Sequence, residues 1–220
     1  MRMREDVGMA DQPKSRSVKI SEDERGGWSS DRPRRDGAPP RPADVSVRCQ
    51  VLSPSHEIRY SPGSLLLIVS PSLTERDRFT QQLIENRASL LSLGRVRVLL
   101  TGRVSEEEIA GRADEILDAA IVNRLEENET VVLTTEGLGA EERERYVRLA
   151  ARFRRPRHLI LIDASGDEIQ EDDRAALNEL RRRLDAGELG AEGFHTALRL
   201  GGGNLGELKR ILFKQAPRDE

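Results

Sequence analysis

The amino-acid sequence predicts an α/β fold in which a five-stranded parallel sheet is flanked by helices. From residue 45 onward, short apolar segments alternate with longer amphipathic segments, and the connections between them are short. One apolar segment, residues 64–69, is continuous, which is typical of a strand that is covered on both faces. Alternating strands and helices form βαβ units, and these units assemble into parallel sheets.

The first elements of this series follow the tail. Residues 48–52 and 56–60 predict a short hairpin, because two β-prone segments lie close together in the chain. Residues 64–69, with the sequence SLLLIV, predict the first strand of the parallel sheet. The apolar spacing that follows predicts a helix over residues 74–91, and VRVLL at residues 96–100 predicts the next strand.

The second half of the domain continues the alternation. We expect a long helix over residues 105–127, a strand over residues 130–134 and a helix over residues 139–153. A strand over residues 157–162 and a helix over residues 171–187 follow. Each strand and helix pair adds one more βαβ unit to the sheet.

The last elements are shorter. Residues 196–200, with the sequence TALRL, predict the strand that closes the series. Three successive glycines then predict a flexible turn. Asn204 is a suitable N-cap, so we expect a final helix over residues 204–212 with one apolar side.

The N-terminal part of the chain has a different composition. Residues 1–44 mix Pro, Gly, Ser and charges of both signs, with few apolar side chains. Such a segment buries too little apolar surface to offset the entropy lost on folding. We therefore expect a disordered tail over residues 1–44 and one domain over residues 45–220.

Composition limits the partners and the location. The formal net charge of the 220-residue chain is -3 and only 3% of its residues are aromatic, so nucleic acid is not a favoured partner. The longest apolar run is far too short to span a bilayer, and no apolar leader segment opens the chain. Cys49 is the single cysteine, and the three histidines are scattered, so neither a disulfide nor a metal site is expected. We expect a cytoplasmic protein with no membrane partner.

The loop after the first parallel strand is the main candidate site. Ligands of parallel α/β sheets bind at the carboxyl ends of the strands, and a phosphate-binding P-loop, G-x-x-x-x-G-K-[ST], follows a strand in this way. Here the same frame reads SPSLTERD over residues 70–77. Ser70 and Glu75 stand at the glycine positions, Arg76 at the lysine position and Asp77 at the hydroxyl position.

Three segments resemble the bacterial polynucleotide kinase domains and related small P-loop kinases. SPGSLLLIVSPS is similar to their first strand and loop, and residues 123–153 are similar to the segment that ends in D-A-T-N and to the helix after it. The helix and E-G-F turn of residues 174–194 are similar to the end of those domains. The likeness covers about residues 55–200. It implies a P-loop NTPase fold, with ATP and Mg²⁺ as cofactors and phosphoryl transfer as the activity.

The positions that carry chemistry in that family have changed in this chain. Thr134, Thr135, Glu136 and Gly137 stand where the family has D-A-T-N, and the segment after residue 100 has no early carboxylate. The segment at residues 163–173, where the family has an arginine-bearing lid, contains neither Arg nor Lys. No lysine occurs between the two at positions 19 and 209, so none from the domain core replaces the missing one.

The replaced loop residues have a structural explanation. Thr74 is a good N-cap for a helix that begins at Glu75, and Asp77 lies three residues further on, close to a capping-box arrangement. Carboxylates in the first turn also favour the helix dipole and repel a triphosphate. The leading interpretation is a pseudoenzyme or interaction module that has lost phosphoryl transfer, binds no cofactor and acts through an unidentified protein partner.

The alternative is a divergent ATP-binding protein, a kinase of a nucleotide or polynucleotide. In that interpretation Asp77 or Asp163, which follows an apolar strand, holds Mg²⁺. A carboxylate that opens a turn is the simpler explanation of Asp163. No catalytic residue is assigned. The candidate nucleotide-binding residues are Ser70, Ser72, Thr74, Arg76 and Asp77.

Overall fold

The computed structural model describes residues 44–163, 169 and 171–214. The prediction of a disordered tail therefore lies outside the described residues, apart from residue 44. The strands of the main sheet are β1 (Gln50–Leu52), β3 (Leu65–Val69), β4 (Leu90–Ser92), β5 (Val131–Thr134), β6 (Arg157–Asp163) and β7 (Thr196–Gly201). The helices are α1 (Leu73–Leu83), α2 (Leu93–Leu100), α3 (Glu106–Glu126), α4 (Ala140–Arg152) and α5 (Glu171–Asp185). A second sheet contains β2 (Glu57–Tyr60) and β8 (Arg210–Phe213).

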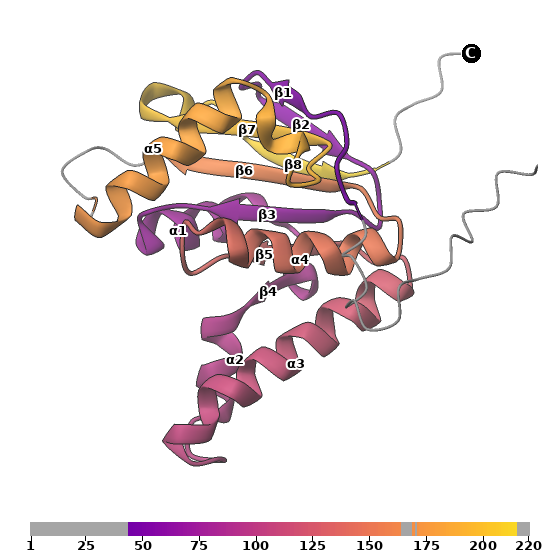
Figure 1. Ribbon diagram of the computed structural model, residues 1–220, viewed down its shortest axis with the longest axis vertical. Coiled ribbons are helices and arrows are strands. Elements are labelled where there is room, and N and C mark those ends of the chain that lie inside the picture. The colour runs from indigo at the N-terminus through magenta and orange to yellow at the C-terminus, as the bar shows by residue number, and fades with distance from the viewer. Residues whose placement is uncertain (1–43, 164–168, 170, 215–220) are drawn as a thin grey trace, which may run out of the picture. The chain divides into compact units, whose positions relative to one another are not determined.

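The main sheet confirms the predicted parallel α/β architecture. Its strand order is β1–β7–β6–β3–β5–β4, and every neighbouring pair is parallel (Figure 1). From β3 the chain passes to β4 and β5 on one side of the sheet, and then to β6 and β7 on the other side. There β1, the first strand of the chain, pairs with β7 at the edge. The loop after β3 therefore lies at the topological switch point, where ligands of open α/β sheets bind.

The central strand is covered on both faces, as its continuous apolar sequence predicts. Leu65, Leu67 and Val69 are fully buried against the cluster that contains α3, α4 and α5. Leu66 and Ile68 are fully buried against the opposite cluster, which contains α1 and the small sheet. Side chains alternate between the two faces of a strand, so β3 supplies both halves of the core.

The sheet differs from the prediction at its β1 edge. It has six strands where five were expected, because residues 50–52 pair in parallel with β7. The predicted hairpin of residues 48–52 and 56–60 is wrong, because β2 pairs in parallel with β8 in the other sheet. A hairpin needs antiparallel bonds between its two strands, and here each strand found a partner about 150 residues away, as the registers Gln50↔Thr196 and Glu57↔Arg210 show.

The segment between β3 and α3 also differs from the prediction. The helix expected over residues 74–91 ends at Leu83, and residues 96–100 form part of helix α2 instead of a strand. Strand β4 lies earlier, at Leu90–Ser92. Residues 96, 98 and 100 would share one face of a strand, but Val96 and Leu100 pack against the core while Val98 is 74% exposed, as a helix requires.

The C-terminal helix expected over residues 204–212 is absent. A short 3₁₀ helix, Gly202–Gly206, is followed by strand β8, which pairs with β2 along its whole length. Ile211 and Leu208 are buried in the cluster beneath α1. Ile211 lies in strand β8 and Leu208 lies in the segment just before it, so the helical spacing of these apolar residues does not reflect a helix.

Helix α3 is the longest described helix and matches the segment predicted at residues 105–127 within one residue at each end. Ala113, Leu117, Ile121 and Leu125 recur at every fourth position and are fully buried. None of the charged side chains of this helix is buried, so they lie on its other faces. Among the described helices, none combines the length and the apolar character needed to cross a membrane.

Candidate functional site

The loop after β3 is a compact turn of three residues. It runs from Ser70 to Ser72, between the end of β3 and the start of α1. The Ser72 N–H donates to the Ser70 hydroxyl at 3.1 Å, and Ser70 is 2% exposed. No residue from 70 to 77, all of them described, has a positive φ. A backbone nest around a phosphate needs alternating right- and left-handed residues, so this turn does not form one.

Helix α1 is capped by Ser72, not by Thr74 as the sequence suggested. The Ser72 hydroxyl accepts a hydrogen bond from the Glu75 N–H at 3.3 Å, and the Ser72 carbonyl accepts one from the Arg76 N–H at 3.0 Å. Thr74 lies in the first turn and is exposed. The expectation that Thr74 caps the helix is therefore wrong, and the helix begins two residues earlier than predicted.

Arg76, at the lysine position of the motif, is turned into the protein. It is only 7% exposed, and one of its Nη atoms donates to the backbone carbonyl of Thr135, just after β5. Its Nε and other Nη atoms donate to the Asp77 carboxylate at 3.1 and 2.9 Å. Its guanidinium therefore joins α1 to the end of β5, at the edge of the sheet where a ligand phosphate is expected.

The five candidate residues have separate roles in the structure. Ser70 and Ser72 hold the turn and the helix end, Thr74 is exposed, and Arg76 and Asp77 pair with each other. They lie close together in the chain, but their polar groups do not converge on one open position. The polar side chains of Ser70, Ser72, Arg76 and Asp77 thus form hydrogen bonds within the protein itself.

Beside this turn lies a cavity of about 780 Å³. It is bounded by α1, by β4 and α2, and by the end of β5. Val98 and Leu99, 74% and 63% exposed, form part of its apolar wall, and Arg87 and Arg95 lie on its polar side. The Thr134 hydroxyl at its β5 end is buried, with no hydrogen-bond partner among the described residues. We call this cavity the α1–α2 groove.

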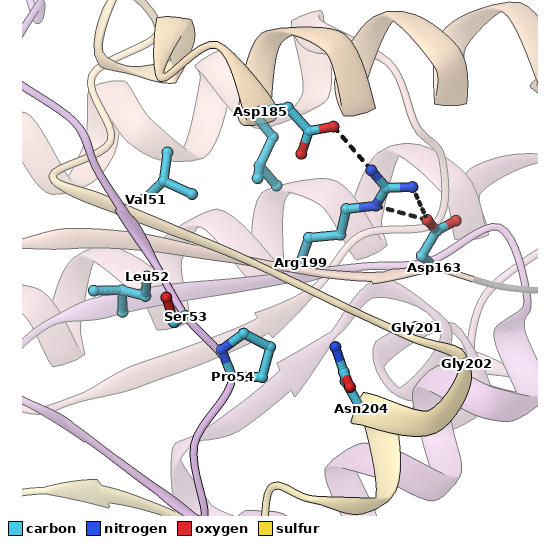
Figure 2. Close-up of a pocket in the computed structure, with 11 residues that line it drawn as sticks. Val51, Leu52, Ser53, Pro54, Asp163, Asp185, Arg199, Gly201, Gly202 and Asn204 are labelled. Atoms are coloured by element: carbon cyan, nitrogen blue, oxygen red, sulfur yellow. Dashed lines mark hydrogen bonds and ion pairs between the residues drawn. The ribbon is translucent and has the colours of Figure 1, made fainter.

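Asp163, the candidate magnesium ligand at the end of β6, is already paired with two arginines. Arg199 donates to it through Nε at 2.8 Å and also binds Asp185 at 2.9 Å, across a pocket of about 470 Å³ (Figure 2). Arg181 of α5 also donates to the same carboxylate. A cation at Asp163 would have to displace both guanidinium groups. Sequence reasoning missed both arginines, although a charged residue within the apolar strand TALRL was a signal for one of them.

The E-G-F turn, one of the closest matches of the resemblance, has a structural role here. Glu192 is 3% exposed and accepts two hydrogen bonds from Arg143, at 2.8 and 2.9 Å, and one from Arg183 at 2.6 Å. Gly193 has a φ of +101°, and a Cβ there would lie 2.8 Å from Val147. Phe194 is fully buried. The turn therefore ties α4 and α5 together.

Within residues 44–163 and 171–214, no three His, Cys, Asp or Glu side chains gather as metal ligands. Cys49 is partly buried, and burial raises the pKa of its thiol.

Comparison with known proteins adds little to this geometry. No protein-family model matches the sequence, and no curated protein matches it. A solved structure of a candidate kinase from Chloroflexus aurantiacus is similar, at 17% sequence identity and a TM-score of 0.44. The alignment covers 64% of this chain and 86% of that one.

Proposed function

We propose that this protein has the scaffold of a P-loop kinase, has lost phosphoryl transfer and acts as a non-catalytic interaction module. The observation that carries the proposal is the position of the Arg76 guanidinium, which is bound to the Thr135 carbonyl and the Asp77 carboxylate. The one cation of the degenerate motif is therefore committed to the protein itself.

The physical reason lies in how phosphoryl transfer is catalysed. The protein contributes positioning and electrostatic stabilisation, and both depend on a backbone cup and an available cation. Here the turn has only three residues, and the Glu75 N–H already donates a hydrogen bond to the Ser72 hydroxyl. Releasing Arg76 would break charge-assisted hydrogen bonds worth about 1.5–3 kcal/mol each. A triphosphate would have to offset that loss and also overcome repulsion from Asp77.

The α1–α2 groove is the surface that we propose for the partner. It presents Val98 and Leu99 to solvent from consecutive positions of α2. Arg87 and Arg95 add positive charge beside this apolar wall. Interfaces combine a buried apolar centre with a polar rim of complementary charge. The partner that matches this surface is a protein segment with apolar side chains flanked by carboxylates.

The loss of nucleotide binding is tested by calorimetric titration of the full chain with ATP and Mg²⁺. We expect no heat of binding up to millimolar nucleotide. Micromolar binding that disappears in Asp77→Ala or Asp163→Ala would overturn the proposal and favour a divergent ATP-binding protein. Glu127→Ala, which removes an exposed carboxylate after α3, is the matched control for loss of negative charge.

The alternative of a divergent ATP-binding protein has less support. It requires Asp163 or Asp77 to hold Mg²⁺, and both carboxylates are engaged by arginines. Coordination by either carboxylate would leave a guanidinium without its partner. The same titration decides between the two functions.

The partner surface is tested with a photo-crosslinking amino acid at position 98 in cells. A crosslinked protein is then purified, and its affinity is measured for the unmodified chain and for Val98→Asp and Leu99→Asp. We expect affinity to fall at least tenfold in both variants, as the loss of a buried apolar contact implies. Ile116→Asp, on the exposed side of α3, is the control. Equal affinities for all four proteins would exclude the groove as the interface.

A further inference from the structure

A small basic pocket lies at the amino ends of the parallel strands, on the opposite edge of the sheet from the turn after β3. Its volume is about 290 Å³. It is lined by the segment before β1, by the connection from α4 to β6, and by His195, which precedes β7. Ligand pockets span about 300–1,000 Å³, so a pocket of this size suits a small group.

Arg157 brings a buried positive charge to this pocket. It is 6% exposed, and its Nε donates to the Gly193 carbonyl at 2.7 Å. Among the described residues, no carboxylate lies within ion-pair distance of its guanidinium. Burial lowers the pKa of Arg157. A buried charge is unfavourable unless a counter-charge accompanies it, so an anion bound in the pocket would stabilise the folded protein.

His195 provides a neutral donor beside this charge. Its Nδ1 accepts a hydrogen bond from the Arg157 backbone N–H at 3.2 Å. In the neutral imidazole the proton therefore lies on Nε2, which becomes a donor. Burial and the charge of Arg157 lower the pKa of His195, so the neutral form is favoured. In this form the ring is able to donate to an anion at neutral pH without adding a further cation.

The remaining charges at the pocket are unbalanced toward positive. Arg154 and Arg155 line it, and Asp44 is the one carboxylate among its lining residues, where it accepts from the Ser46 N–H. Arg155 uses its donors on the end of α3, at Leu125, Glu126 and Asn128. Arg155 therefore contributes positive charge to the pocket. Arg154 is exposed, and its guanidinium N–H groups are available to a ligand.

Arg154 also occupies a position that favours glycine. It follows the end of α4 with a φ of +57°, and its N–H donates to the Ala151 carbonyl. This is the left-handed position that ends many helices, where glycine has no steric penalty. An arginine at this position has a less favourable backbone conformation than glycine would have. Its presence is consistent with a functional role for the Arg154 guanidinium.

We propose that this pocket binds a phosphate dianion, held by the guanidinium groups of Arg157 and Arg154 and by the His195 Nε2–H. Three guanidinium groups oppose one carboxylate, so the site carries the excess charge that a dianion needs. Guanidinium groups match the oxygens of phosphate in geometry and charge. The site is independent of the proposed function, because it shares no residue with the turn after β3 or the α1–α2 groove.

The test is titration of the full chain with inorganic phosphate at constant ionic strength. Amide NMR signals and the thermal midpoint are followed, with chloride as the reference ion. We expect saturable shifts centred on residues 154–157 and 195, and a midpoint that rises with phosphate. No saturable shift there, or equal effects of phosphate and chloride, would overturn the proposal.

The sharpest variant is Arg154→Gly. It relieves the left-handed backbone, so the midpoint without phosphate should rise, while phosphate affinity should fall about tenfold. A purely structural role for Arg154 predicts unchanged affinity, which would contradict the site. Arg157→Gln retains a donor for Gly193 and should abolish the phosphate response. Should that variant not fold, Arg154→Gly alone still decides.

Arg152→Gln is the matched control. Arg152 lies at the end of the same helix and over the Phe153 ring, but it does not line the pocket. We expect its phosphate affinity to equal that of the unmodified chain. An equal loss in Arg152→Gln and Arg154→Gly would mean diffuse attraction and would overturn a defined site. Titration with methyl phosphate in parallel distinguishes two kinds of site. A site for phosphate monoesters would bind methyl phosphate at least as tightly as inorganic phosphate, whereas a site for the free ion would bind it more weakly.

Discussion

Arg76 and Thr135 are 59 residues apart in the chain, and the guanidinium of the first donates to the backbone carbonyl of the second. This bond connects the first turn of α1 to the end of β5, on either side of the switch point. Arg76 stands where a P-loop has its phosphate-binding lysine. The sequence retains a positive charge at this position, but the Arg76 guanidinium binds the end of β5, where a P-loop lysine would bind a phosphate.

Replacing Arg76 should therefore destabilise the fold. Arg76→Met leaves the Thr135 carbonyl without its donor, and we expect the free energy of unfolding to fall by about 1.5–3 kcal/mol. Urea denaturation followed by circular dichroism measures the change. Arg78→Met, an exposed neighbour on α1, should change stability by less than about 0.5 kcal/mol. Equal effects of the two substitutions would remove the structural role assigned to Arg76.

The helix cap makes a second prediction, which separates the observed boundary from the one that the sequence suggested. Ser72→Ala removes the acceptor for the Glu75 N–H and should cost about 1 kcal/mol of unfolding free energy. Thr74→Ala should have almost no effect, because Thr74 lies inside the helix and is exposed. The same denaturation experiment compares them, and a larger loss for Thr74→Ala would restore the later helix start.

Glu192 should be the most sensitive carboxylate in the described part of the domain. Glu192→Gln leaves Arg143 buried, at 2% exposure, without a counter-charge, and removal of one partner from a buried pair costs about 3–5 kcal/mol. Glu188→Gln breaks an exposed pair with Arg182 and should cost less than about 1 kcal/mol. Thermal and urea denaturation test both variants. A loss below about 1 kcal/mol for Glu192→Gln would contradict the role of this cluster.

His158 should make stability depend on pH. Its ring stacks on Tyr60 at 4.3 Å between ring centroids, and its Nδ1 lies 2.9 Å from the Thr196 hydroxyl. Burial, with smaller contributions from His195 and Arg157, lowers the pKa of His158 from 6.5 to about 3. Below pH 6.5 the unfolded chain gains a proton that the folded protein does not, so this stability is complete above pH 6.5 and declines toward pH 3.

The measurement compares the protein with His158→Phe, which keeps an aromatic ring beside Tyr60 but does not titrate. Between pH 6 and pH 4 the difference in unfolding free energy should change by about 1.4 kcal/mol per pH unit in favour of the variant. Taking the difference cancels the titration of the carboxylates that both proteins share. A difference that is constant with pH would show that His158 does not remain neutral in the folded state.

Much of the fold could be predicted because it depends on local pattern. The continuous apolar run ending at Val69 indicated a strand buried on both faces, and the four-residue spacing of α3 indicated its buried side. The alternation of such segments was sufficient to predict a parallel sheet. The sequence also placed the candidate loop after the first strand of the parallel sheet, and in the structure that strand ends at the switch point. The binding of a ligand there stays a prediction.

Other elements depended on contacts between distant residues. VRVLL has the β-branched composition of a strand, but the Ser92 cap and the packing of Val96 and Leu100 against the core make it a helix. The segment around Ile211 has helical spacing, but pairing with β2 makes it a strand. Local propensity differs by about 1 kcal/mol or less per residue, so tertiary packing decides such cases.

The sequence by itself determined the α/β class, the central strand and the absence of the motif's glycines and lysine at positions 70–77. Only the tertiary structure decided where the charges go: Arg76 to Thr135, Asp163 to Arg181 and Arg199, and Arg157 to a pocket in which no described carboxylate forms an ion pair with it. The physical reason is that an apolar pattern is set by neighbours in the chain, whereas a charge is satisfied by whichever partner the folded chain brings within a few ångströms.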